Sequence, residues 1–313
     1  KNGCMIKWPL SARPGLSDSR FRYALPYWTG VMAVKAAARL PRRSGLQVRL
    51  DLLGSVLANR ARLACSHSDL WSLVGSIEPE VINLHNVQSA LSSDAIMALS
   101  REYPIAWTLH DLSVFRGYSS RFVTRSGRVV ETFPVDPRLV DEESRRRMIH
   151  SDSNIRFVSP SRWLKDSVLP ESAGYKEILV IPNGLSREQF YPVPRKIARQ
   201  HLGLFNDEFY LLFIARRLEY ERMNIGTLTE ALELLADSRI KVLAVGYASH
   251  EFKNRFPWFV YIDPVYDFEK LRLVYSAADV LVTTSLGDNL PNIVMESLFC
   301  GTPVVGSRVG GIP

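Results

Sequence analysis

The stretch DVLVTTSLGDNLPNIVMESLFCGTPVVGSRVGGIP, residues 279–313, decides the fold of this chain. Its first seven residues are an apolar run that ends in polar residues, which is typical of a buried strand. Pro291 suits the first turn of a helix, where its missing N–H needs no partner. Asp288 or Asn289 is expected to cap that end of the helix. Gly301 suits the left-handed position at which a helix ends.

The helix in this stretch carries an apolar stripe at helical spacing, which is expected to pack on a core. The stripe consists of Ile293, Val294, Leu298 and Phe299. Because a short apolar strand follows at residues 304–305, the order is strand, loop, helix, strand, as in a parallel α/β sheet. Ligands of such sheets bind at the carboxyl ends of the strands, and a helix N-terminus favours anions. Residues 286–290 are therefore predicted to form a phosphate site.

The length of 313 residues predicts two domains. With 46% hydrophobic and 23% charged residues, the composition is that of an ordinary globular protein. No apolar run of about 18 residues is present, so no membrane-spanning helix is expected, and no secretory signal is visible. The three cysteines, Cys4, Cys65 and Cys300, lack the spacing of metal ligands and cannot all pair. A reducing, cytoplasmic location is therefore expected.

The positive charge is concentrated in residues 1–62. This segment carries twelve Lys or Arg against two Asp, a charge of +10, whereas the whole chain carries +7. Aromatic residues are interleaved with the basic ones. We expect the segment to lie on an anionic membrane surface. Contact with nucleic acid and a plain solvated basic face are the alternatives.

A pass along the chain predicts two α/β halves. In the first half, the expected strands are 80–86, 104–111, 155–161 and 178–184, the expected helices are 89–101 and 162–167, and the polar residues 121–136 are expected to form a surface loop. In the second half, the expected strands are 209–215, 240–246 and 259–263, and the expected helices are 226–236 and 268–277. Residues 185–194 are predicted to be a linker, so the predicted domains are 1–187 and 188–313.

The closing stretch resembles the donor-site signature of the retaining glycosyltransferases of family 4. That family carries two Glu separated by seven residues, then ACGTPVV and GGIPE; here Asp288 and Glu296 have that spacing, with Asp in the first place. Three further segments are similar to sequences of the branch that builds exopolysaccharides: WTLHDLSVF (107–115), VSPSRWL (158–164) and VIPNGLSREQFYP (180–192).

The resemblance covers about residues 80–313. It implies an α/β fold of two Rossmann-like domains that face each other across a cleft, the GT-B fold. It also implies that the family's opening strand and glycine-rich loop are missing before Lys1, and that its last helices are missing after Pro313.

The resemblance assigns donor-binding roles around the start of the closing helix. It implies that Glu296 accepts hydrogen bonds from ribose hydroxyls and that Asp288 contacts hydroxyls of the transferred sugar. The backbone N–H groups of Asn289, Leu290 and Asn292 are expected to meet the diphosphate. The alternatives are an ordinary helix-surface carboxylate for Glu296 and a plain helix cap for Asp288.

His110 matches the family's histidine that faces the donor sugar across the cleft, and Asp111 is expected to fix its tautomer. A purely structural histidine is the alternative. A metal site with His85 is not expected, because the spacing fits no compact ligand set and the fold normally needs no metal. His110 and Asp111 are thus the predicted catalytic residues, and no cofactor is expected beyond the nucleotide-diphosphate sugar as co-substrate.

The family holds the leaving diphosphate with an Arg and a Lys, because fixed cations stabilise the charge that grows there. The corresponding segment is FIARRLEYERMNIG, residues 213–226. A gapless match places Arg222 on the Arg and Met223 on the Lys, whereas a looser match places Arg217 and Arg222 on this pair. Arginine binds phosphate with two parallel hydrogen bonds, so Arg222 is expected to compensate for the lysine. The alternative is that these arginines only lie on the surface.

The resemblance implies a retaining, metal-independent hexosyltransferase of polysaccharide biosynthesis. Its partners are expected to be a nucleotide-sugar donor, a saccharide or lipid-linked saccharide acceptor and an anionic membrane surface, but no nucleic acid. The expected location is the cytoplasm, peripheral to the inner face of the membrane. The alternative is a glycosyltransferase-like binding scaffold that has lost turnover, because Met223 and Asp288 depart from the family pattern.

Overall fold

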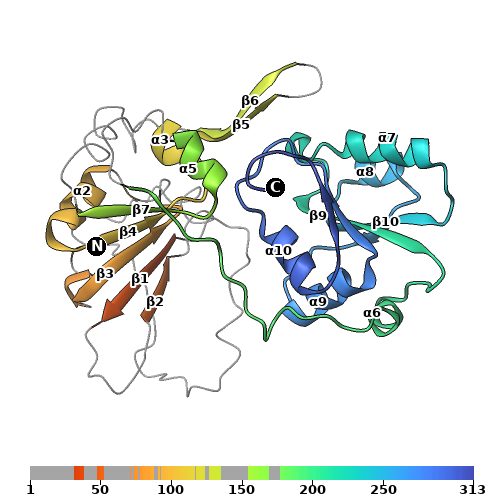
Figure 1. Cartoon of the computed structure of the whole chain (residues 1–313), viewed down its shortest axis with the longest axis horizontal. Helices are drawn as coiled ribbons and strands as arrows, with labels where there is room; N and C mark the ends of the chain where they lie inside the picture. The colour runs from red at the N-terminus through yellow and green to blue at the C-terminus, as the bar shows by residue number, and fades with distance from the viewer. Residues whose placement is uncertain are drawn as a thin grey trace, which may run out of the picture. The chain divides into compact units, whose positions relative to one another are not determined.

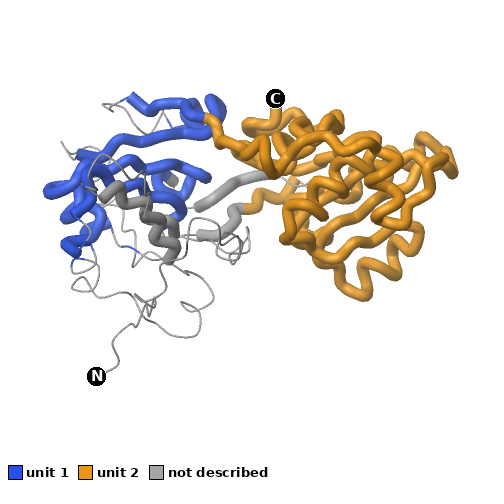
Figure 2. The backbone as a smooth tube through the Cα atoms, turned by 90° about the horizontal axis from the view of Figure 1, so that it is seen from below, with its two compact units in different colours: residues 1–119, 132–181 blue, residues 120–131, 182–313 orange. Residues whose placement is uncertain are grey.

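The computed structural model describes residues 32–38, 48–52, 71, 74–76, 78–87, 91, 93–116, 118–123, 127–134, 154–168 and 177–313. The chain divides into two compact units, residues 1–119 with 132–181 and residues 120–131 with 182–313 (Figure 2). The boundary predicted after residue 187 stays a prediction. The basic segment 1–62 lies outside the described residues except for two strands, so its membrane contact also stays a prediction.

The first unit is built on a six-stranded sheet of order β2-β1-β3-β4-β7-β8 (Figure 1). Its strands are β1 (Met32–Ala38), β2 (Val48–Leu52), β3 (Pro79–His85), β4 (Ile105–Thr108), β7 (Ile155–Ser159) and β8 (Leu179–Val180). The last four run parallel to one another, and all four were predicted from the sequence. β1 pairs antiparallel with both β2 and β3. The sequence had not indicated these two strands.

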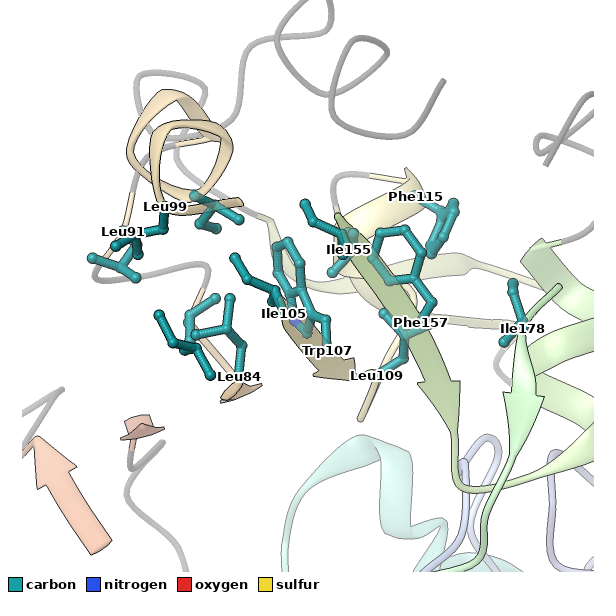
Figure 3. Close-up of a cluster of buried hydrophobic side chains, with 14 of the residues drawn as sticks. Leu84, Leu91, Leu99, Ile105, Trp107, Leu109, Phe115, Ile155, Phe157 and Ile178 are labelled. Carbon is teal, nitrogen blue, oxygen red and sulfur yellow. The ribbon is translucent and has the colours of Figure 1, made fainter. Parts of the chain in front are cut away.

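The core of the first unit lies between the parallel strands and their helices. These helices are α2 (Ser93–Glu102), α3 (Ser113–Arg116) and α5 (Arg162–Val168). Trp107 and Phe157, from the neighbouring strands β4 and β7, place their ring centroids 5.8 Å apart, and Phe115 meets Phe157 edge-on at 5.3 Å (Figure 3). The apolar strand sequences therefore serve a buried parallel sheet, as their composition predicts.

A two-stranded antiparallel hairpin replaces the surface loop predicted at residues 121–136, so that prediction is wrong. The hairpin consists of β5 (Tyr118–Val123) and β6 (Val129–Pro134). Aromatic and β-branched residues in both segments favour strands, although the stretch is polar overall. Gly127, with a φ of +79°, supplies a left-handed conformation between the strands.

The second unit is built on a five-stranded parallel sheet of order β11-β10-β9-β12-β13 (Figure 1). Its strands are β9 (Phe209–Arg217), β10 (Ile240–Tyr247), β11 (Val260–Ile262), β12 (Val280–Thr283) and β13 (Val304–Gly306). Its helices are α6 (Arg195–Leu202), α7 (Ile225–Leu235), α8 (His250–Arg255), α9 (Phe268–Ala277) and α10 (Asn292–Phe299). All five strands and the helices α7, α9 and α10 were predicted.

Helices cover both faces of this sheet, so side chains on both faces of the central strand β9 are buried. Tyr210 and Leu212 pack with Tyr275 of α9 in one apolar cluster. Leu211 and Phe213 pack on the opposite face with residues of α7 and α8. Figure 1 shows α7 and α8 on one side of the sheet and α9 and α10 on the other. This is a doubly wound α/β arrangement.

Helix α10 differs from its predicted form at both ends. It begins after Pro291 without any side-chain cap, so the predicted cap by Asp288 or Asn289 is wrong. Asp288 instead accepts a hydrogen bond from Arg222, as described below. The predicted apolar stripe is partly wrong too, since Leu298 is 56% exposed and Phe299 is also exposed. Ile293 and Val294 do pack on the core, and the left-handed Gly301 is confirmed, with a φ of +77°.

Among the described residues, no helix combines the length and the apolar character needed to cross a membrane.

Candidate functional site

Two loops meet at the carboxyl edge of the second sheet. Since β9 and β12 are parallel neighbours, the loops that follow them leave the same edge. The first loop contains a short 3₁₀ turn, η3 (Glu221–Met223), and the second leads into α10. Leu286 N–H donates to Arg222 O at 2.9 Å, and Thr284 Oγ1 donates to Met223 O at 2.6 Å. The two loops are therefore held together by hydrogen bonds.

Arg222 and Asp288, two of the predicted donor-binding residues, form an ion pair across these loops. Arg222 Nη1 lies 2.8 Å from Asp288 Oδ2 and also donates to Gly287 O at 2.9 Å. Asn289 N–H donates to Asp288 Oδ1 at 3.0 Å. Both charged side chains are partly buried, so solvent screens the pair less than an exposed one. Arg217, the other candidate clamp, is exposed at the end of β9.

The glycine pair near the end of the sequence closes over Asp288. Gly311 N–H donates to Asp288 O at 3.0 Å. Gly310 has a φ of +60°, and a Cβ at this position would lie 1.6 Å from Asp288 O. Only glycine allows this close approach. In the sequence, the only sign of this backbone contact is that the two glycines are adjacent.

The start of α10 holds the predicted diphosphate-binding positions. Asn289 and Leu290 precede Pro291, Asn292 follows it, and all three are partly exposed. Only Asn292 belongs to the helix, whose first backbone N–H groups have no acceptor inside it. The Asn289 N–H donates to Asp288 Oδ1, so an anion would have to replace that acceptor. Asn183 Nδ2 donates to Asn292 Oδ1 at 3.1 Å and connects this helix start to the segment that enters the second unit. Sequence reasoning had assigned no role to Asn183.

Glu296 lies in the interior of the second unit, about one turn further along α10 than Asn292. It is 4% exposed, so the alternative of a helix-surface carboxylate is wrong. Tyr275 of α9 donates a hydrogen bond from Oη to Glu296 Oε2 at 2.6 Å. Burial raises the pKa of Glu296 to about 7, and the Tyr275 hydrogen bond opposes this rise. The free protein therefore holds this carboxyl group near the midpoint of its titration at neutral pH.

In the first unit, His110 pairs with His85 at the carboxyl ends of β4 and β3. His85 Nδ1 lies 2.8 Å from His110 Nε2, and the ring centroids are 5.1 Å apart. Burial lowers the pKa of His110, which favours the neutral imidazole. A bond between two ring nitrogens needs one N–H and one lone pair, so this contact restricts the tautomers of both rings.

The Asp111 side chain contacts the start of α3. Ser113 donates to Asp111 Oδ1 from its backbone N–H at 2.9 Å and from its hydroxyl group. Burial raises the pKa of Asp111, and the two Ser113 bonds oppose this rise. The predicted control of the His110 tautomer by Asp111 stays a prediction, as does the cleft between the two domains. Within the described ranges, no three His, Cys, Asp or Glu side chains gather as metal ligands would.

Comparison with known proteins supports the second unit most directly. Residues 208–313 match the family model described as "Glycosyl transferases group 1". A D-inositol 3-phosphate glycosyltransferase of Geodermatophilus obscurus is 31% identical over 155 residues, which is 44% of this chain and 34% of that protein. The chain thus spans about a third of the length of this relative.

Two solved structures share the fold at low sequence identity. Sucrose-phosphate synthase of Thermosynechococcus elongatus has a TM-score of 0.58 and 20% identity, over 79% of this chain and 60% of that one. HepE of Anabaena, in complex with UDP and glucose, has a TM-score of 0.56 and 17% identity, over 82% of this chain and 65% of that one. The predicted fold class, α/β with two Rossmann-like domains of the GT-B type, is confirmed.

Proposed function

We propose that this chain is a retaining glycosyltransferase that moves a hexose from a nucleotide-diphosphate sugar to a saccharide acceptor. One observation carries the proposal. The segment that matches the glycosyltransferase family model, residues 208–313, contains Arg222, Asp288 and Glu296 together at one sheet edge and the helix that follows it.

The proposed donor roles follow from the chemistry of each group. The diphosphate lies at the start of α10, on the backbone N–H groups of Leu290 and Asn292, and the Asn289 N–H exchanges its bond to Asp288 Oδ1 for one to a phosphate oxygen. Arg222 uses Nη1 for Gly287 and Asp288, which leaves Nε and Nη2 to bind phosphate oxygens and stabilise the leaving charge. Asp288, held by that guanidinium group, offers its carboxylate to the sugar hydroxyls.

The proposal also covers the acceptor and the location at the membrane. We propose a lipid-linked saccharide acceptor in polysaccharide biosynthesis, reached from the cytoplasmic face of the membrane. The charge of +10 in residues 1–62 supports this, because a basic segment is attracted to anionic lipids. The resemblance to family 4 supports retention, hexose transfer, independence of metal ions, and the placement of His110 and Asp111 beside the sugar.

A second candidate function is a binding scaffold without turnover, and one observation favours it. In the gapless match Met223 occupies the position of the family's lysine, and its side chain packs against the apolar cluster around Phe213 and Leu218. No positive charge is present at this position to assist the leaving diphosphate.

A transfer assay separates the two candidates. The full chain is incubated with uridine, guanosine and adenosine diphosphate glucose and a saccharide acceptor, and proton NMR follows the anomeric signals. We expect release of one nucleoside diphosphate and a product with the anomeric configuration of the donor. His110→Ala should lower turnover more than it lowers diphosphate affinity. An inverted product would contradict retention, and nucleotide binding without any release would support the scaffold.

A further inference from the structure

Tyr275 and Glu296 form a buried pair between α9 and α10, and the donor roles above use only the carboxylate. The hydroxyl group of Tyr275 lies 2.6 Å from Glu296 Oε2, and the two residues are 0% and 4% exposed. Burying a carboxylate without a hydrogen bond costs free energy. The hydrogen bond from Tyr275 therefore stabilises Glu296 in the interior.

The surroundings of Tyr275 hold its hydroxyl group in one place. Its ring meets Phe190 edge-on, with centroids 6.4 Å apart. Its backbone carbonyl accepts a hydrogen bond from Thr302 Oγ1 at 2.7 Å, and Thr302 N–H donates to Ser297 O beyond the end of α10. Tyr275 is therefore linked through Thr302 to the turn that follows α10, and its ring is fully buried.

In the part of the chain that the structure describes, Tyr275 is the hydrogen-bond partner of one carboxylate oxygen only, Oε2. Glu296 Oε1 is left to accept a hydrogen bond from a ligand. We propose that Tyr275 is a positioning residue for the nucleotide: it holds Oε2 in the interior and thereby presents Oε1 to a ribose hydroxyl. This inference rests on the proposed function.

Among the residues that the structure describes, Cys300 and Arg272 are ionisable groups near the pair. Cys300, at the end of α10, is held neutral because burial raises the pKa of its thiol to about 12. Arg272 of α9 acts on that thiol and stacks on Tyr191 at 4.0 Å. Strand β13, which also packs on α10, carries no ionisable side chain. The ionisation of Glu296 is thus controlled by burial and by Tyr275.

The pair predicts a pH dependence of nucleotide affinity. An ionised carboxylate accepts from a ribose hydroxyl better than a protonated one, so binding favours loss of the Glu296 proton. The Tyr275 hydroxyl stabilises the ionised form, so its removal raises the pKa of Glu296 further. More of the free protein would then hold a neutral carboxyl group at pH 7.

The test measures nucleoside diphosphate affinity by calorimetry in the full chain at pH 7 and pH 9. The probe is whichever of uridine, guanosine and adenosine diphosphate the parent binds. We expect Tyr275→Phe to bind the nucleoside diphosphate about tenfold more weakly than the parent at pH 7, which is the scale of one hydrogen bond to a charged group. At pH 9 the difference in affinity between the two proteins should be smaller. The matched control is Tyr261→Phe, which removes a hydroxyl that donates to Phe256 O, and its affinity should equal that of the parent at both pH values.

The outcomes separate the two proposals. A Tyr275→Phe variant that binds like the parent, or that is weakened by the same factor at both pH values, overturns the positioning role alone. A parent that binds none of the three diphosphates overturns the proposed function and the positioning role with it.

A second measurement applies if Tyr275→Phe does not fold. The ¹³Cζ resonance of Tyr275 in the parent should titrate near pH 7 with Glu296, and nucleoside diphosphate should move that midpoint to lower pH. The titration should be absent from Glu296→Gln. A midpoint that nucleotide leaves unchanged would overturn the role.

Discussion

Arg222 commits one terminal nitrogen to the loop that carries Asp288, so the guanidinium group is in place before any ligand arrives. If it stabilises the leaving diphosphate, Arg222→Ala should reduce kcat by about 10²-fold, the usual scale for one lost electrostatic donor. Arg222→Met should be nearly as slow, because a stem without charge cannot replace the cation. Steady-state transfer rates with saturating donor measure both variants.

Two matched variants decide between the alternative clamps. Arg217→Ala should transfer sugar at close to the parent rate, because Arg217 is exposed at the end of β9. Met223→Lys, which restores the family's cation, should be neutral or mildly faster. If Arg217→Ala is inactive while the Arg222 variants are normal, Arg217 is the clamp and the assignment of Arg222 is wrong.

Glu296 should also make stability depend on pH. Its pKa is about 7 in the folded chain against 4.5 unfolded, so the folded state keeps a proton that the unfolded state releases. The free energy of unfolding therefore falls as pH rises from 4.5 to 7, by on the order of 3 kcal/mol, and is level above that window. The free energy of unfolding of Glu296→Gln should not fall in this way, because a glutamine side chain does not titrate. Urea unfolding should show that the free energy of unfolding of the Gln variant rises relative to that of the parent between pH 5 and pH 8. A difference between the two that does not change with pH would contradict the effect of burial on Glu296.

At the scale of elements, a buried ion pair joins α6 to the start of β12. Asp279 Oδ2 accepts from Arg199 Nη2 at 2.6 Å, whereas Oδ1 accepts from Arg195 Nη1 at 2.8 Å. The Arg199 side chain is 4% exposed and that of Arg195 is 49% exposed. Arg199→Met should lower the free energy of unfolding by about 3–5 kcal/mol, because it leaves a buried carboxylate without its main partner.

Arg195→Met is the control on the same carboxylate. It should cost less than about 1 kcal/mol, since an exposed ion pair contributes little. Urea unfolding of both variants measures the difference. Equal losses would mean that burial does not govern the strength of this pair.

The loop between β12 and α10 is shaped by Gly310. Because a Cβ at this position would meet Asp288 O, Gly310→Ala must displace the Asp288 loop. Diphosphate affinity should fall by about tenfold or more, the scale of one lost charge-assisted bond. Gly203→Ala is the control, because Gly203 also has a positive φ but has open space around it. Its affinity should match that of the parent, and calorimetry of the two variants should differ accordingly.

For the whole molecule, local sequence patterns were sufficient to predict the parallel strands of both sheets and the helices α2, α5, α7, α9 and α10. The apolar runs of β9, β10 and β12 are long enough to identify buried parallel strands, and α9 was predicted at its observed bounds. The hairpin β5–β6 was missed because its strands are stabilised by pairing with each other rather than by an apolar run. The exposure of Leu298 shows that helical spacing alone does not say how much of a stripe is covered.

The candidate site was predicted in its residues but not in its contacts. Glu296 was identified by its spacing from Asp288, yet nothing in the sequence indicated that Tyr275, 21 residues earlier, would hold it. The ion pair of Arg222 with Asp288 joins residues 66 positions apart. Such contacts depend on the tertiary arrangement of loops, which short-range periodicity does not encode.

We propose that the second unit binds a nucleoside diphosphate through the start of α10 and Glu296. Titration calorimetry of the full chain with uridine, guanosine and adenosine diphosphate tests it most directly, with Glu296→Gln beside the parent. We expect the parent to bind one of the three, and the Gln variant to bind it about 10- to 100-fold more weakly, the range for hydrogen bonds to a charged group. Absence of binding to all three, or equal affinity of the parent and Glu296→Gln, would contradict it.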